Sequence, residues 1–184
     1  MKKQAILAIV LLISLSTFSQ KAHRVMGWKI SKDIPKNELK LNLGTSIFGL
    51  FPEISYERIL NSDISAGVST GVGLDSDSYP YNFSIMPYFR WFFGGSSENL
   101  QKYGAGFFIE VNGAIVSNPD NSYYDHSTET MRTKNELGAG LGLAIGWKYL
   151  SSNNWVGEVY FGSGREFTHD SAYGRVGITI GKRF

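Results

Sequence analysis

Apolar and polar residues alternate with a period of two over most of the chain beyond residue 37. The clearest run spans residues 64–74, where one face is apolar apart from a single threonine and the other contains only Ser and Gly. Such alternation predicts a β-strand with two different faces. No apolar stripe of helical period persists beside it. We predict eight strands, within residues 39–47, 53–57, 64–74, 83–93, 103–112, 137–148, 155–162 and 175–183.

The second face of these strands is rich in glycine and charged residues. In a soluble β-sandwich or lipocalin-like barrel, which is the alternative, this face would meet the solvent. Glycine on a solvent-facing surface would weaken the strand and would offer no side chain to the solvent. In a narrow eight-stranded membrane barrel the same face lines the lumen, where there is little room for side chains. We therefore predict an all-β fold, an eight-stranded antiparallel up-and-down transmembrane β-barrel over residues 37–184.

The first residues have the pattern of a secretory signal peptide. Lys2 and Lys3 precede an apolar run over residues 5–15, and small residues follow it. The run is about half of the ~20 residues that a membrane-spanning helix needs. We expect a signal peptide over residues 1–19 and a periplasmic lead-in over residues 20–36. The barrel would then be an exported monomer in a Gram-negative outer membrane, with both of its ends in the periplasm.

The connections between the strands differ in length. If the lead-in is periplasmic, the turns near residues 61, 94 and 151 face the periplasm, and the loops near residues 49, 75, 117 and 164 face outward. The longest and most polar loop, over residues 117–135, is then external. Short inner turns with longer outer loops are typical of outer-membrane barrels.

Large aromatic residues gather on the apolar face at one end of the predicted strands. Amphipathic rings are enriched where lipid headgroups meet water, so these residues predict an aromatic girdle in contact with outer-membrane lipids. The predicted members are Trp91, Phe93, Tyr103, Trp147, Trp155 and Phe184.

Composition excludes several classes of function. Lys and Arg number 18 against 16 Asp and Glu, and a net charge of +2 is too balanced for a nucleic-acid-binding protein. The absence of cysteine excludes a disulfide framework, thiolate metal sites and cysteine nucleophiles. The 184 residues are enough for one domain behind a leader. We expect no cofactor and no metal site, since His126 with Asp120 and Asp125 reads as part of a solvated loop.

Ionisable residues recur on the predicted inward faces. A narrow lumen would make an unpaired charge costly to desolvate, so opposite charges should pair there. The pairs could brace the barrel, or they could form an ion path or a gate. Inward positions nearer the strand ends are Glu38, Lys40, Glu53, Glu136 and Arg183. The predicted central network consists of Glu57, Arg90, Glu110, Lys148, Glu158 and Arg175.

Three segments resemble a known group of proteins. Residues 39–44 (LKLNLG), 52–58 (PEISYER) and 87–93 (PYFRWFF) are similar to an uncharacterised family of small outer-membrane β-barrel proteins of the Bacteroidetes. The resemblance covers about residues 37–184 and implies an eight-stranded barrel without an established activity. More distantly, the layout resembles the OmpA transmembrane domain and OmpX. Phe184 resembles the terminal signal that the barrel-assembly machinery reads, although Lys182 departs from that signal.

One group of residues suggests catalysis. His169 and Ser171, with Glu166 nearby, resemble the His-x-Ser pair of outer-membrane lipid A deacylases. Ala172 stands where those enzymes carry Asn, and no acidic residue follows later in the chain. A His and a Ser meet by chance in many polar loops. We therefore predict that the chain is not an enzyme.

The expected function follows from these features. We expect a barrel with a plugged lumen and a structural or adhesive role, in which the outer loops meet an extracellular ligand. The alternatives are a lipid-modifying hydrolase that uses His169 and Ser171, and a pore for small solutes.

Overall fold

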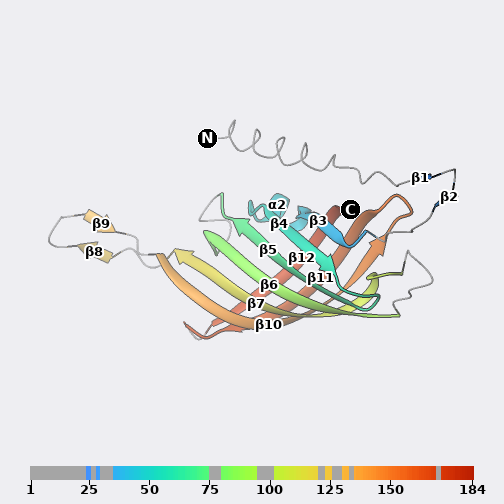
Figure 1. The fold of residues 1–184 in the computed structure, drawn as a ribbon. Helices are drawn as coiled ribbons and strands as arrows, with labels where there is room; N and C mark the ends of the chain where they lie inside the picture. The colour runs from blue at the N-terminus through green and yellow to red at the C-terminus, as the bar shows by residue number, and fades with distance from the viewer. Residues whose placement is uncertain are drawn as a thin grey trace. The chain divides into compact units, whose positions relative to one another are not determined.

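Eight strands close into an antiparallel β-barrel in the computed structural model of the chain (Figure 1). Each strand pairs with the next, and the last pairs with the first, which confirms the predicted all-β fold. The structure describes residues 24–25, 28–29, 35–74, 80–94, 102–119, 123–125, 130–132, 135–168 and 171–184. The barrel strands are β3 (Asn37–Asn42), β4 (Glu53–Ile59), β5 (Ile64–Val72), β6 (Phe83–Phe93), β7 (Gly106–Pro119), β10 (Asn135–Leu150), β11 (Trp155–Glu166) and β12 (Ser171–Arg183).

The other elements are short. They are β1 (Arg24–Val25), β2 (Trp28–Lys29), α2 (Leu43–Phe48), β8 (Tyr123–Asp125) and β9 (Thr130–Arg132). β1 pairs with β2, and β8 pairs with β9, each as a separate two-stranded sheet. In the described part of the chain, no helix has the length and apolar character needed to cross a bilayer. The barrel lies within one compact unit, residues 36–183. The expected signal peptide lies outside the described residues and stays a prediction.

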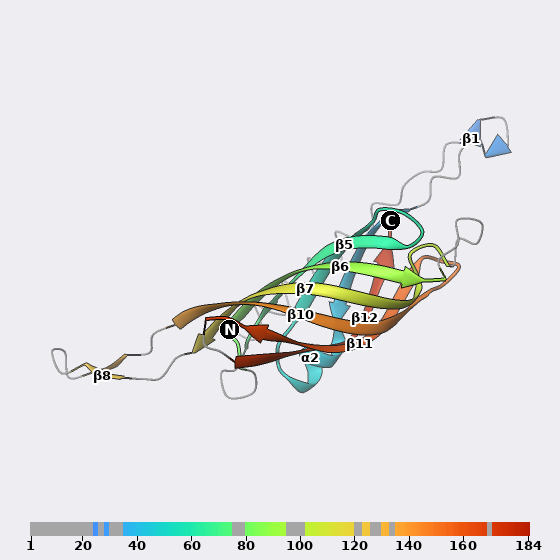
Figure 2. The same ribbon diagram turned by 90° about the horizontal axis from the view of Figure 1, so that it is seen from below.

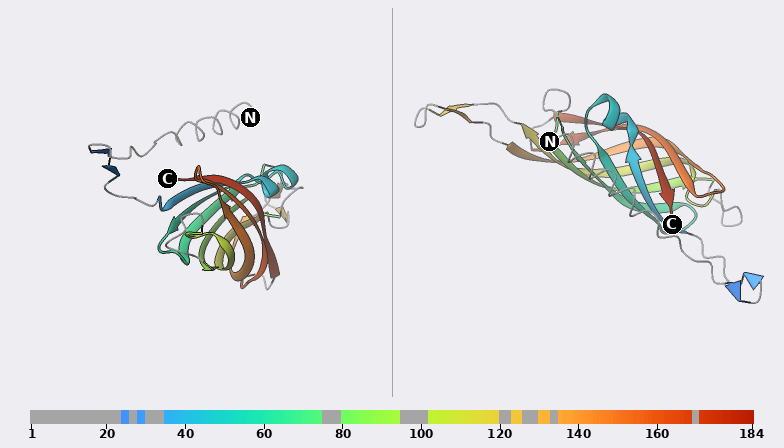
Figure 3. Two further views of the ribbon diagram at one scale, coloured as in Figure 1. Left: turned by 90° about the vertical axis from the view of Figure 1, so that its right-hand side faces the viewer. Right: turned by 90° about the horizontal axis from the view of Figure 1, so that it is seen from above.

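The barrel has two different ends. β3 begins and β12 ends at one of them, which we call the terminal end, and the turns after β4, β6 and β10 lie there. The opposite end, called the far end, carries α2 and the segments that follow β5, β7 and β11. Figure 2 shows β5, β6, β7 and β10 side by side in that order, and Figure 3 shows the strands curving around a common axis.

The two faces of the wall divide the side chains by type. Val68, Leu141 and Ile178 point outward and are 40%, 59% and 51% exposed. On the same strands and their neighbours, Glu57 and Arg175 point inward and are buried. A soluble protein normally buries its apolar side chains and leaves its charges in water. Here the arrangement is reversed, as the alternation pattern predicted for a lipid-facing wall.

Glycine lets large inward side chains pack against the wall. A Cβ atom on Gly177 would overlap the ring of Tyr160, and one on Gly67 would lie 2.5 Å from the ring of Tyr88. The small residues of the inward face are therefore required by the rings that fill the lumen.

The first strand is shorter than the predicted strand over residues 39–47, because the chain leaves the wall after Asn42 and forms α2. Asn42 caps this helix by accepting a hydrogen bond from the Thr45 N–H at 3.4 Å. The same side chain donates to the Val176 carbonyl at 3.2 Å and accepts from the Ile178 N–H at 3.2 Å. The Asn42 side chain thus continues the hydrogen bonding between β3 and β12 after the backbone of β3 has left the wall. The alternation of apolar and polar residues continues past Asn42, so it did not predict the helix that Asn42 caps.

Candidate functional site

Charged side chains from all around the barrel wall meet inside the lumen. Five acidic and five basic residues are joined by ion pairs, and every one of them is buried. Equal numbers of the two charges leave this network neutral, which reduces the cost of removing the groups from water. We call this set the lumen network. Its members are Glu38, Glu53, Glu57, Glu110, Glu158, Lys40, Arg90, Lys148, Arg175 and Arg183.

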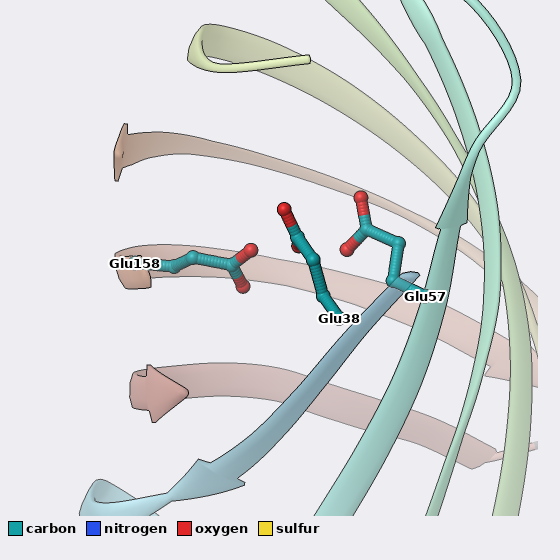
Figure 4. A group of neighbouring side chains, drawn as sticks. All are labelled: Glu38, Glu57 and Glu158. Carbon is teal, nitrogen blue, oxygen red and sulfur yellow. The ribbon is translucent and has the colours of Figure 1, made fainter. Parts of the chain in front are cut away.

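Two lysines hold three carboxylates together near the terminal end. Lys148 Nζ lies 2.8 Å from Glu38, 2.5 Å from Glu57 and 3.2 Å from Glu158. Lys40 Nζ contacts Glu57 and lies 2.7 Å from Glu158. The carboxylates come from β3, β4 and β11 and converge on one point of the lumen (Figure 4).

The same three carboxylates have the spacing of a metal site. One oxygen from each of Glu38, Glu57 and Glu158 lies within 4.8 Å of the others. However, the ammonium groups of Lys40 and Lys148 already occupy the positions of cationic partners. A metal ion would have to displace both of them, so the geometry does not favour a metal centre.

Arg90 crosses the middle of the lumen. Its guanidinium contacts Glu110 at 2.7 Å, Glu57 at 2.8 Å and Glu158 at 3.0 Å. The group also lies 4.5 Å from the ring centroid of Tyr88 and 4.3 Å from that of Phe108. Cation–π contacts of this kind add to ion pairing where water is excluded. Arg90 and the two rings therefore fill the centre of the barrel.

Arg175 extends the lumen network toward the far end. It contacts Glu110 at 2.6 Å and Glu53 at 3.2 Å, and it donates to Ser69 at 3.3 Å. Beyond it, the Tyr173 hydroxyl donates to Asn112 at 2.7 Å. The polar contacts thus run continuously from one end of the lumen toward the other.

Arg183 closes the lumen network at the terminal end, and one girdle prediction fails there. Arg183 Nη1 donates to the carbonyl of Tyr103 at 2.6 Å, and Nη2 donates to that of Gly104 at 3.0 Å. Tyr103 is only 8% exposed and precedes β7, so it does not belong to the outward girdle. The left-handed φ values of Gly104 (+58°) and Gly106 (+105°) turn the chain inward. Sequence alternation could not show this turn.

All six residues of the predicted central network lie in the lumen network. Sequence reasoning left Glu38, Lys40, Glu53 and Arg183 out of the centre because they stand near strand ends. The pairing brings them level with the others: Glu38 is the partner of both Glu57 and Arg183 across the two edges of β3. Glu136 was also expected to face inward, and its side chain lies outside the described residues.

Aromatic side chains line the outward face at the terminal end. Trp91 stacks on Phe93, with 5.3 Å between the ring centroids, and Phe93 lies 5.7 Å from Phe107. Trp147 and Trp155 are exposed on the neighbouring strands, and Phe184 is exposed directly after β12. Phe107 and Tyr149 are also exposed at this end, and the predicted girdle did not include them.

The catalytic candidates do not form a triad in the described residues. Ser171 donates a hydrogen bond directly to Glu166 at 3.1 Å, and His169 lies outside the described residues. A serine nucleophile needs a base between its hydroxyl and the carboxylate. Glu166 is buried at the far end. The burial of Tyr81 and, to a smaller extent, the nearby charge of Glu166 raise the pKa of the Tyr81 hydroxyl above its ordinary value.

A shallow groove of about 580 Å³ crosses the outward wall. The groove forms where two small residues, Ser163 on β11 and Gly174 on β12, face each other. Larger apolar residues such as Leu143 and Val176 flank them. The groove is mostly apolar and open, and it provides no converging polar groups for catalysis.

Comparison with known proteins assigns this chain to no family. No protein-family model matches the sequence, and no curated protein matches it. Among solved structures, the chain is similar to the Yersinia pestis outer membrane protein Ail in a phospholipid bilayer nanodisc. The identity is 9% and the TM-score is 0.36, with 82% of this chain and 99% of that chain covered. The barrel itself defines the class, a closed eight-stranded antiparallel barrel with a charged interior.

Proposed function

We propose that this chain is a small outer-membrane β-barrel with a closed lumen, which serves as a non-catalytic scaffold and displays its far-end loops to the exterior. The observation that carries the proposal is the reversed wall, with apolar side chains exposed outside and the lumen network buried inside. Water would make this arrangement unfavourable, because exposed apolar surface costs about 25 cal/mol per Å². Hydrocarbon makes it favourable.

The backbone supports a membrane location. Only structures that satisfy every backbone hydrogen bond internally span a bilayer, and a closed barrel does so. A tilted strand needs roughly 9–11 residues to cross. Several strands reach this length, with 11 residues in β6, 12 in β11 and 13 in β12. The aromatic residues at the terminal end suit the level of the lipid headgroups.

The expected orientation places the terminal end in the periplasm. The predicted signal peptide and lead-in support this orientation, since both precede β3. The resemblance to small barrels of the Bacteroidetes supports a location in a Gram-negative outer membrane. This location stays a prediction.

The lumen network supports a closed barrel over a pore. Arg90 and its stacked rings occupy the middle of a lumen that eight strands make narrow. A water-filled path would require these ion pairs to separate. The adhesive role draws support from the far end, where β7 and β10 are the longest strands, with 14 and 16 residues. They lead into the segment 120–134, which would stand outside the cell.

Cell fractionation combined with a gel-shift assay tests the proposal. A folded membrane barrel should be recovered with the outer membrane and should migrate differently before and after boiling in detergent. Recovery in a soluble fraction, with migration that boiling does not change, would contradict it. Purified chain in planar bilayers should show no steady conductance, and stable channels would contradict the closed lumen.

Loop display needs a separate test. Replacing residues 120–134 by a short Gly-Ser linker should remove adhesion of cells that carry the barrel, while the boiling-dependent gel shift remains. Adhesion that survives this replacement would contradict a role for this segment.

A further inference from the structure

Three cationic side chains lie at the rim of the terminal end. Lys36 immediately precedes β3, Arg58 is on β4 and Lys182 is on β12, and all three are exposed. Within the described part of the chain, none of them takes part in an ion pair. We call Lys36, Arg58 and Lys182 the rim cations. They differ in this respect from the buried bases, which all have acidic partners.

Strand pairing brings the rim cations together on three neighbouring strands. Lys182 is the partner of Leu39 on β3, and Leu39 is the partner of Tyr56 on β4. Arg58 is the partner of Asn37, the residue that follows Lys36. The Lys36 carbonyl also accepts a hydrogen bond from the N–H of Ile59 at 2.7 Å. The three cations therefore lie along one stretch of the rim.

Aromatic rings place this stretch at the depth of a lipid headgroup. Lys182 Nζ lies 5.4 Å from the ring centroid of Trp155. Tyr56 is exposed on the outward face, and its hydroxyl donates to Asn37 at 2.8 Å. Rings of this type lie where the hydrocarbon ends and the polar headgroups begin. Lys182, beside Trp155, and Arg58, two residues after Tyr56 on the same face of β4, are thus at the level of lipid phosphates.

Among the described residues of this part of the wall, no acidic side chain competes for the rim cations. The outward positions described on β3, β4, β11 and β12 carry no Asp or Glu. The acids of these strands, such as Glu38 and Glu57, point inward and are paired in the lumen network. Asp63 follows β4 in the next turn and forms no ion pair with the rim cations.

We propose that the rim cations bind the phosphate group of an anionic phospholipid, such as phosphatidylglycerol, in the leaflet at the terminal end. This inference rests on the proposed function, because lipid reaches this face only if the barrel spans a membrane. The Arg58 guanidinium can bind phosphate in a bidentate manner, and the lysines add charge. Trp155 and Tyr56 pack beside the glycerol region. Clusters of cations beside a bilayer bind anionic lipids by the same electrostatics.

Lipid titration of the purified full-length chain tests this site. The chain is placed in zwitterionic detergent, and short-chain phosphatidylglycerol or phosphatidylcholine of the same chain length is added. The NMR signal of the Trp155 indole N–H is followed, after assignment with Trp155→Phe. Phosphatidylglycerol should shift this signal saturably, and added salt should weaken the effect. Trp91, on β6, should not respond.

Neutral variants show which cations carry the binding. Arg58→Gln and Lys182→Gln should each weaken phosphatidylglycerol binding roughly fivefold. Arg165→Gln is the matched control, because Arg165 is an exposed outward cation near the far end of β11. This control should leave the affinity unchanged.

Three results would overturn the site. They are an equal response to phosphatidylcholine, an equal response to inorganic phosphate alone, and unchanged binding in both Gln variants. The boiling-dependent gel shift is measured on the same samples. A wild-type chain that keeps the shift but shows no preference for phosphatidylglycerol overturns the lipid site alone. Loss of the shift in the wild-type chain overturns the membrane barrel and the site with it.

Discussion

Glu38 and Arg183 face each other across the seam between β3 and β12 and form a buried ion pair, with Arg183 Nε 2.7 Å from the Glu38 carboxylate. This seam joins the first and last strands of the barrel and has only five residue pairs. The ion pair therefore links closure of the wall to the lumen network.

Breaking this pair should weaken the barrel. Glu38→Gln leaves Arg183 without its carboxylate in a buried site, and we expect the free energy of unfolding to fall by about 3–5 kcal/mol. Urea unfolding in lipid vesicles, followed by tryptophan fluorescence, measures the change. The double variant Glu38→Gln/Arg183→Gln should be less unstable than the sum of the single variants. Simple additivity would contradict a direct coupling.

Glycine at position 177 should be required for the lumen to be filled. Gly177→Val places a side chain where the ring of Tyr160 lies, so we expect a much smaller folded fraction in the gel-shift assay. Gly174→Val on the same strand is the control, because a Cβ there meets nothing within 4 Å. Tyr160→Ala combined with Gly177→Val should recover part of the folded fraction. Equal folding of the two single Val variants would contradict this packing.

The outward wall should respond to charge as a lipid-facing surface does. Leu143 is exposed on β10, and Leu143→Arg should cost about 2–4 kcal/mol if the site lies near the middle of a bilayer. In a soluble protein the same change at an exposed site would have little effect. Unfolding in vesicles measures the cost, and Leu143→Phe provides an apolar control. A neutral result would contradict a lipid-facing wall.

Ser171 should be dispensable for lipid chemistry. Its hydroxyl donates directly to Glu166, so Ser171→Ala should leave the lipid A acyl pattern of cells carrying the barrel unchanged. Mass spectrometry of extracted lipid A, compared with cells lacking the chain, provides the readout. An acyl chain that disappears with the wild-type protein and returns with Ser171→Ala would instead establish a hydrolase.

The sequence by itself determined the strands and the two faces of the wall. A period of two allows a strand only two faces, so Val68 and Leu141 could be assigned to the outside from their positions alone. The inward direction of Glu57 and Arg90 followed in the same way. Their need for partners followed from the cost of burying a single charge. These conclusions depend on local geometry, which neighbouring residues fix.

Only the tertiary structure decided which groups meet. Lys40 contacts Glu158 across 118 residues of sequence, because the register of three strands, β3, β12 and β11, brings the two residues to the same level. Register depends on pairing between distant segments, and alternation along one strand carries no information about it. The helix after Asn42 and the inward turn at Tyr103 were decided in the same way. Both interrupt the alternation because contacts with β12 from elsewhere in the chain stabilise the departure from the wall.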